Sequence, residues 1–278
     1  MATHVEKALA FRALHEELGA FVVPNAWDAG TARILGALGF RALATTSAGL
    51  AFALGRRDGA AAISREETLA NARAIAEATD LPVSADLENG FAHEPQAAAA
   101  TIRLAADAGV VGGSIEDSTG DPSAPIYDFD LAVERIAAAV AVARSMPFPF
   151  TLTARAENFL HGRRDVADTI RRLQAYEAAG ADVLYAPGLS TLNEIKAITS
   201  AVSRPVNVVM GSWNPDLTVD QLAAAGVKRI SVGGALARAA LSAFIRAAIE
   251  IRDGGTFIYT REAAPLAQIN ALLDGEKS

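Results

Sequence analysis

Residues 83–91 read VSADLENGF, a short apolar run that ends in acid and turns at a glycine. The run is typical of a buried strand, and alternation along it places Asp86 and Glu88 on the same side. Neighbouring carboxylates repel each other and are costly to desolvate, which a divalent cation would offset. A second strand-like run, 112–117, also ends in acid at Glu116. We therefore expect Asp86, Glu88 and Glu116 to form a site for Mg²⁺ (or Mn²⁺), although helix caps or solvated loop acids are an alternative.

The composition places the chain among ordinary globular proteins. It has 278 residues, 51% hydrophobic and 21% charged, which suits one large α/β domain or two small ones with a sizeable core. The net charge of -7 and the lack of a clustered basic face argue against a nucleic-acid partner. There are no cysteines, which excludes disulfides, thiolate metal sites and a cysteine nucleophile.

The N-terminal segment, from Met1 to His15, is polar and helix-like and has no apolar signal segment. No apolar run in the sequence is long and pure enough to span a bilayer. We therefore expect a cytoplasmic location and no membrane partner.

A repeated pattern runs through the chain, in which an Ala-rich helix stops at glycine and a short apolar strand follows. Eight such strands predict a (β/α)8 TIM barrel of class α/β, as a single domain over residues 1–278 with a C-terminal helical tail. A doubly wound open sheet is the structural alternative, but no Gly-x-Gly-x-x-Gly opens a helix near the N-terminus. The predicted strands are Phe21–Asn25, Ala42–Ser47, Val83–Glu88, Gly113–Asp117, Phe150–Arg155, Val183–Ala186, Val206–Met210 and Ile230–Gly233. The helices predicted between them include Arg65–Ala78, Pro95–Ala108, Asp130–Ser145, Val166–Ala179 and Leu192–Val202.

The tail contains two further predicted helices, Ala235–Arg252 and Glu262–Leu273. This is more than closing a barrel requires. The surplus apolar helix either packs on a neighbouring subunit or caps its own barrel.

From about Phe11 to Arg252 the sequence resembles the isocitrate lyase/phosphoenolpyruvate mutase superfamily. The resemblance is closest to its methylisocitrate lyase and phosphonopyruvate enzymes, and it rests on the order and spacing of several motifs together. These motifs are PNAWDA at 24–29, TSAG at 46–49, LGRRD at 54–58, SADLENGF at 84–91, SIED at 114–117 and TARAE at 153–157.

The resemblance implies a Mg²⁺-dependent barrel that binds a small carboxylate. It also implies a homo-oligomer, usually a tetramer built as a dimer of helix-swapped dimers, in which the eighth helix is exchanged between subunits. The resemblance implies that Asp86 binds the metal directly and that Asp58, Glu88 and Glu116 hold its water shell. It implies that Ser47, with the backbone amides near Ala48 and Gly49, binds the carboxylate and oxo group of the substrate. Arg155 would bind the substrate carboxylate, and Asn207 would be a further substrate contact.

Each of these roles has a structural alternative. Ser47 could cap the following helix, and Asp58 could cap the run that starts near Gly59. Arg155 could be an ion-pair partner of Glu88 or Glu116 inside the barrel mouth.

The sequence departs from the superfamily's lyases in the loop that follows Glu116. Residues 117–127 contain no Cys, His or Lys, whereas those lyases carry a Lys-[Lys/Arg]-Cys-Gly-His loop whose Cys acts as general acid. His161 is an alternative acid/base, because its ordinary pKa of ~6.5 suits proton transfer, unless it is a surface loop histidine. Tyr127 and Tyr185 are further candidates.

These residues predict a Mg²⁺-dependent lyase or decarboxylase that acts on a small 2-oxo or 2-hydroxy acid through a metal-stabilised enolate. Oxaloacetate is the simplest substrate, because loss of CO₂ does not need the missing cysteine during bond cleavage. A phosphonopyruvate hydrolase or mutase, and a catalytically silent 2-oxo-acid-binding barrel, are the alternatives.

Overall fold

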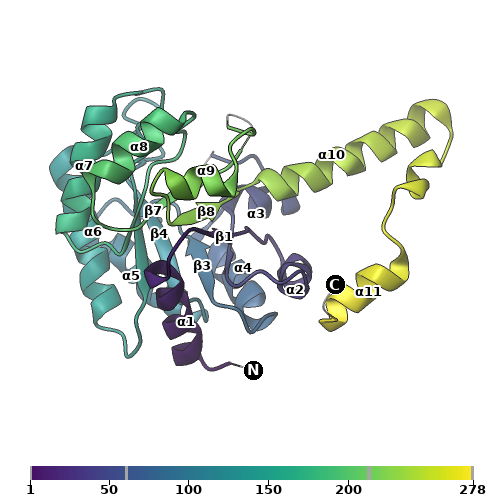
Figure 1. The fold of residues 1–278 in the computed structure, drawn as a ribbon, viewed down its shortest axis with the longest axis horizontal. Helices are drawn as coiled ribbons and strands as arrows, with labels where there is room; N and C mark the ends of the chain where they lie inside the picture. Colours follow the sequence, from purple (N-terminus) through teal and green to yellow (C-terminus); the bar gives the residue numbers. More distant parts are fainter. Residues whose placement is uncertain (1, 60–61, 212–213, 277–278) are drawn as a thin grey trace.

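The computed structural model describes residues 2–59, 62–211 and 214–276. Strands and helices alternate along most of this length (Figure 1). The strands are β1 (Phe21–Val23), β2 (Leu43–Ala44), β3 (Val83–Asp86), β4 (Gly112–Glu116), β5 (Thr151–Arg155), β6 (Val183–Tyr185), β7 (Val206–Val209) and β8 (Arg229–Ser231). The helices are α1 (His4–Glu16), α2 (Ala29–Ala37), α3 (Ser47–Ala53), α4 (Arg65–Glu77), α5 (Pro95–Asp107), α6 (Phe129–Arg144), α7 (Val166–Ala178), α8 (Leu192–Ala201), α9 (Val219–Ala224), α10 (Ala235–Ile249), η1 (Glu250–Gly254, a π-helical turn), η2 (Ile258–Arg261, a 3₁₀ turn) and α11 (Leu266–Asp274).

The eight strands form one parallel sheet in the order β1-β8-β7-β6-β5-β4-β3-β2. A bridge between Asn25 and Ala44 joins the two ends of the sheet, where Ala44 N donates to Pro24 O at 2.9 Å and Ala26 N donates to Ala44 O at 2.8 Å. The sheet therefore closes into a (β/α)8 barrel, and the predicted fold is confirmed. The carboxyl ends of all eight strands open at the same mouth.

Each predicted strand has a counterpart, but several are shorter at their carboxyl ends. The predicted strand Ala42–Ser47 ends at Ala44, and Ser47 is already the first residue of α3. The Thr46 hydroxyl caps this helix by accepting from Gly49 N at 3.3 Å. The structural alternative for Ser47, that it caps this helix, is therefore wrong, because Thr46 has that role.

Helix α1 covers the bottom of the barrel, opposite the mouth. Its Phe11 is fully buried, and a Cβ added at Gly112 would lie 2.9 Å from the Phe11 ring and 2.9 Å from Thr151 O. Gly112 thus lets α1 approach the strand ends closely. His15 lies on the same helix, packed edge-on against Phe11 and Phe21.

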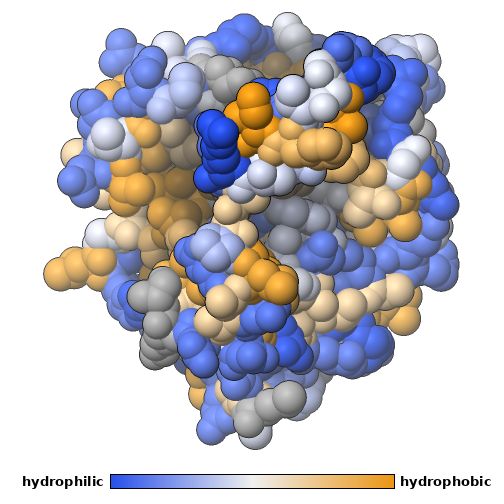
Figure 2. Space-filling model, turned by 90° about the vertical axis from the view of Figure 1, so that its right-hand side faces the viewer, coloured by the Kyte–Doolittle hydropathy of each residue, from blue (hydrophilic) through white to orange (hydrophobic). Residues whose placement is uncertain are grey.

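The C-terminal helices follow a path that leaves the barrel and then returns to its side (Figure 1). Helix α10 extends outward from β8 and buries only Ala237, while α11 returns to α2, where Arg33 Nη1 donates to Leu273 O at 3.3 Å. Figure 2 views the end of the molecule from which α10 extends, and hydrophobic and hydrophilic residues are mixed on this face. Among the described residues, none of the helices is both long and apolar enough to cross a bilayer.

The predicted tail helices differ from the structure at their ends. The helical run that begins at Ala235 changes to a π-helical turn after Ile249 and ends before Gly255. The helix expected to begin at Glu262 begins at Leu266 instead. The reason is Pro265, which has no N–H to donate and disfavours helical backbone in the residue before it.

His15 predicts a pH-dependent stability. Its Nδ1 contacts Phe11 O at 2.8 Å, its buried Nε2 has no partner among the described residues, and burial lowers its pKa to about 3. Because the folded pKa lies below the unfolded value of ~6.5, its contribution is present above that pH and is lost as the pH falls below it. Between pH 7 and pH 5 the wild type should lose about 2 kcal/mol more unfolding free energy than His15→Gln, measured by urea denaturation. Equal losses in the two proteins would show that His15 does not titrate on unfolding.

Candidate active site at the barrel mouth

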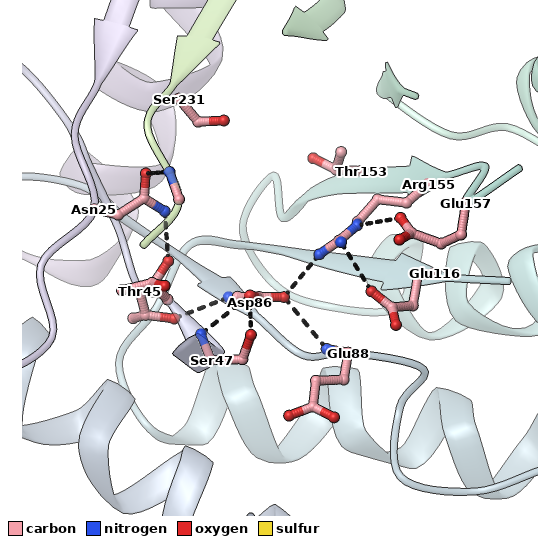
Figure 3. A network of polar contacts seen from close by, with 12 residues as sticks. Asn25, Thr45, Ser47, Asp86, Glu88, Glu116, Thr153, Arg155, Glu157 and Ser231 are labelled. Carbon is pink, nitrogen blue, oxygen red and sulfur yellow. Dashed lines mark hydrogen bonds and ion pairs between the residues drawn. The ribbon is translucent and has the colours of Figure 1, made fainter. Parts of the chain in front are cut away.

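Asp86, the last residue of β3, is held on both sides by groups from other strands (Figure 3). Its Oδ2 accepts from Ser47 Oγ at 2.9 Å and from Ser47 N at 3.2 Å. Its Oδ1 accepts from Arg155 Nη1 at 2.9 Å, and its backbone N donates to Thr45 Oγ1 at 2.9 Å. The Asp86 carboxylate is therefore fixed in position at the mouth of the barrel.

Arg155, the last residue of β5, joins three carboxylates. Besides Asp86, its Nη2 lies 3.0 Å from Glu116 Oε2 and its Nε donates to Glu157 Oε1 at 2.9 Å. The Arg155 side chain is 13% exposed, and its Cζ lies 5.1 Å from the centre of the Tyr185 ring. The ion-pair interpretation of Arg155 thus holds for Glu116 but not for Glu88. Nη1 and Nη2 each have a second N–H that can still meet a ligand.

Burial and repulsion between neighbouring acids disfavour charge on Asp58, Glu88 and Glu116. Burial raises the pKa of Glu88 to about 7, with further contributions from Asp86 and Asp58. Burial likewise raises the pKa of Asp58 and holds that of Glu116 well above its ordinary value. Burial alone would lower the pKa of Arg155, but Glu116, Glu157 and Asp86 together hold it well above its usual range.

The donor set fits a hard divalent cation. Asp58, Asp86, Glu88, Glu116 and Glu157 interact electrostatically around the single guanidinium of Arg155, so the group carries excess negative charge when ionised. Oxygen ligands and uncompensated carboxylates are what Mg²⁺ and Mn²⁺ prefer. Across residues 2–59, 62–211 and 214–276, no three acidic or histidine side chains lie close enough together to hold one ion directly. This arrangement suits an ion held by one carboxylate directly and by the others through water.

The Glu88 side chain points in a different direction from those of the other acids. Its backbone N contacts Asp86 Oδ1 at 3.5 Å, while its carboxylate points away from Arg155 (Figure 3). Its φ of 47° is in the left-handed region, as is that of Phe91 at 59°, which is uncommon for residues other than glycine. The acidic loop is therefore a strained segment held by its surroundings.

Arg135 of α6 supplies much of that support. It is 1% exposed, its Nη1 donates to Ala92 O at 2.6 Å and to His93 O, and its Nη2 donates to Asn89 O. The Arg135 Cζ also lies 4.2 Å from the centre of the Tyr127 ring. This role could not be predicted from the sequence, because Arg135 lies more than forty positions from the carbonyls it binds.

Ser47, Ala48 and Gly49 lie in the first turn of α3. Ser47 and Ala48 line the cavity at the mouth, but Gly49 is buried, and its N–H already donates to Thr46 Oγ1. A Cβ at Gly49 would lie 2.7 Å from the Trp27 side chain, so glycine is required there for packing. The structure thus places Ser47 and Ala48 where a ligand can reach them and gives Gly49 a supporting position.

Asn207 lies deeper in the barrel and is 1% exposed. Its Nδ2 donates to Ser231 Oγ at 3.0 Å, and its Oδ1 accepts from Arg229 Nε at 2.8 Å. Both ends of the amide are thus occupied by the protein, although the residue lines the cavity. Its role in substrate binding stays a prediction.

His161 lies beside the loop that follows β4. Its Nε2 is 3.2 Å from Ser118 Oγ, and burial lowers its pKa. Tyr127 lies at the end of this loop, and its hydroxyl contacts His93 Nδ1 at 2.6 Å. Neither His161 nor Tyr127 is among the described residues that line the cavity beside Asp86.

Two cavities flank the acids. The first, of about 280 Å³, is lined by Ser47, Asp58, Asp86, Arg155, Tyr185 and Arg229 among others. The second, of about 510 Å³, is lined by Glu88, His93, Glu116 and Ser118 among others. The predicted metal-binding acids therefore lie along two cavities, and the first is of the size that suits a small acid.

A family model for phosphoenolpyruvate phosphomutase matches residues 11–252. The chain belongs to the phosphoenolpyruvate mutase/isocitrate lyase superfamily. The resemblance seen in the sequence motifs is confirmed.

The similarity to other members of the superfamily extends over most of the chain. A candidate lyase/mutase from Burkholderia cenocepacia, known from its crystal structure, is 61% identical, with 96% of this chain and 95% of that chain covered and a TM-score of 0.93. An oxaloacetate decarboxylase of Ectopseudomonas mendocina is 32% identical over 250 residues, which are 87% of this chain and 83% of that protein. A phosphonopyruvate hydrolase solved with oxalate and Mg²⁺ is 26% identical, with a TM-score of 0.86 over 99% of this chain and 96% of that one. The superfamily thus includes both decarboxylases and enzymes that act on phosphonopyruvate.

Removing the Arg155 guanidinium should destabilise the fold at neutral pH. Arg155→Leu leaves three partly or fully buried carboxylates without their counter-charge, and we expect a loss of about 3–5 kcal/mol in unfolding free energy. Arg155→Lys should lose less, because it keeps the charge but cannot reach three carboxylates at once. Arg171→Leu, which removes the exposed pair with Asp168, is the matched control and should have a much smaller effect. Urea denaturation in which the Arg155 and Arg171 variants lose equal stability would contradict this account.

Proposed function

We propose that the chain is a metal-dependent lyase or decarboxylase that acts on a small 2-oxo or 2-hydroxy acid at the mouth of its barrel. The observation that carries the proposal is the set of three carboxylates paired with Arg155, with Asp58 and Glu88 nearby, beside a cavity of about 280 Å³. Membership of a superfamily that contains an oxaloacetate decarboxylase and a Mg²⁺-containing hydrolase supports it.

Asp86 would hold Mg²⁺ or Mn²⁺ directly, with Asp58, Glu88 and Glu116 on its water shell, and the bound ion would polarise the 2-oxo group and stabilise the enolate. The residues of the chain provide the rest. Arg155 offers Nη1 and Nη2 to the substrate carboxylate, and Ser47 Oγ lies next to Asp86 where it can orient the oxo group. The walls of the first cavity limit the ligand to a small acid.

The loop after β4 favours decarboxylation over release of a carbanion-like product. Residues 118 and 126 pair as an antiparallel bridge, and Thr119 N donates to Pro125 O at 3.0 Å, so the loop folds on itself. It contains no Cys, His or Lys that could protonate a departing succinate. Loss of CO₂ needs no proton at the moment of bond cleavage, which makes oxaloacetate the best candidate substrate.

The proposal extends to a homo-oligomer, in which α10 packs on a neighbouring copy as in a dimer of helix-swapped dimers. The support is the surface of α10, where Leu241, Phe244, Ile245 and Ile249 are all exposed. Phe244 is 68% exposed, and contiguous apolar surface of this kind on a protein marks an interaction site.

The metal site is tested by Asp86→Ala. This variant should lose Mg²⁺ binding, measured by calorimetry, because it removes the carboxylate assigned as the direct ligand. The matched control is Asp121→Ala, which removes an exposed carboxylate of the neighbouring loop and should bind Mg²⁺ as the wild type does. EDTA should inactivate the wild type, and Mg²⁺ or Mn²⁺ should restore it. Unchanged Mg²⁺ affinity in Asp86→Ala would rule out this site.

The reaction is tested by assaying oxaloacetate, methylisocitrate and phosphonopyruvate at matched concentration with Mg²⁺. We expect turnover of oxaloacetate, with methylisocitrate at least ~10²-fold slower, because proton delivery typically contributes ~10²–10⁴-fold. Efficient succinate release would mean that another group replaces the missing cysteine. Turnover of phosphonopyruvate alone would identify a P–C bond enzyme, and no turnover at all would favour a binding protein.

A further inference from the structure

Tyr185, the last residue of β6, lines the first cavity next to Arg155. Its ring is held by the guanidinium, whose Cζ lies 5.1 Å from the ring centre. Among the residues that the structure describes, none is hydrogen-bonded to the Tyr185 hydroxyl. The other phenols on this side of the barrel are paired, Tyr127 with His93 and Tyr176 with Asp117. Tyr185 therefore has a hydroxyl that is available to a ligand.

A second arginine, Arg229 of β8, interacts with Tyr185 from within the barrel. Arg229 is 5% exposed, and its Nε and Nη2 donate to Asn207 Oδ1 at 2.8 Å and Thr153 Oγ1 at 2.9 Å, which are both neutral acceptors. Its Nη1 is buried and has no partner in the described part of the chain. Burial of a guanidinium without a carboxylate is costly, and burial lowers the pKa of Arg229 to about 10. Its positive charge is thus not compensated, in contrast to that of Arg155.

The positive charges of Arg155 and Arg229 favour the loss of a proton from a phenol beside them. Burial raises the pKa of Tyr185, so its hydroxyl stays protonated at neutral pH. A phenolate formed during turnover would lie near Arg155 and Arg229, whose positive charges would oppose the repulsion from Glu157 and Asp86. The other candidates are less well placed, because His161 contacts Ser118 and Tyr127 contacts His93, away from the first cavity.

We propose that Tyr185 is the catalytic proton donor to C3 of the enolate that decarboxylation leaves in the first cavity. This inference rests on the proposed function. The O–H bond of Tyr185 breaks as the C3–H bond forms, and the electron pair of the C2–C3 double bond makes the new bond while the carbonyl at C2 is restored. Water entering through the open mouth reprotonates the phenolate. In sum, oxaloacetate and one proton from water give pyruvate and CO₂.

The test compares the release of CO₂ with the formation of the pyruvate keto form, during turnover of oxaloacetate with Mg²⁺. In the wild type the two should coincide. Tyr185→Phe keeps the ring next to Arg155 but lacks the hydroxyl. The product should therefore leave the site before C3 is protonated, and the keto form of pyruvate should appear later than CO₂. If the enol is retained instead, kcat should fall by ~10²-fold or more with KM near that of the wild type.

Tyr127→Phe is the matched control, since it removes a phenol at the same end of the barrel that does not line the first cavity, and it should show no lag. Thermal unfolding of each variant establishes that it is folded. A Tyr185→Phe enzyme with coincident products and wild-type kcat would overturn the assignment, as would a lag found in His161→Asn instead. If the wild type releases no CO₂ while Mg²⁺ still binds, the proposed function fails and the step assigned to Tyr185 is removed with it.

Discussion

The three ion pairs of Arg155 are the interaction on which the mouth of the barrel depends. A parallel barrel brings the ends of its strands together, so acids from β3, β4 and the segment after β5 converge in one place. Without a cation their repulsion and desolvation would oppose folding. One guanidinium fixes Asp86, Glu116 and Glu157 in a shared geometry, and its single positive charge cannot neutralise all three when they are ionised.

The rest of the molecule supports that arrangement in separable ways. The Thr45 and Ser47 side chains orient Asp86 from one side, and Arg135 binds the carbonyls of the strained loop that carries Glu88. Asp117, the neighbour of Glu116, has a different function, because it points outward to Arg172 and Tyr176 of α7 and joins the end of β4 to that helix. Glu116 and Asp117 thus point in opposite directions, one toward the site and one toward α7, because successive side chains of a strand alternate in direction.

The sequence was sufficient for the barrel and for the position of the acids. Strands alternate with Gly-terminated helices in a regular way, and polar residues at strand ends must share the mouth of a closed parallel sheet. It was not sufficient for contacts between distant parts of the chain. Arg135 and Arg229 resemble any other arginine in the sequence, and only packing places one beneath the acidic loop and the other inside the barrel. The position of α10 could not be derived either, because an apolar helix face indicates that something covers it but not what. Whether Asn207 and His161 act on substrate also depends on partners that periodicity cannot identify.

The most direct test of the central claim, that the acids around Arg155 form a metal centre for a 2-oxo acid, is a crystal structure of the protein with Mn²⁺ and oxalate, with anomalous data collected for the metal. Our account predicts one strong anomalous peak in the first cavity, with an Asp86 oxygen in the coordination sphere and oxalate bound between the ion and Arg155. Oxalate bound to Arg155 with no anomalous peak near Asp86, or Mn²⁺ bound only elsewhere on the molecule, would contradict it.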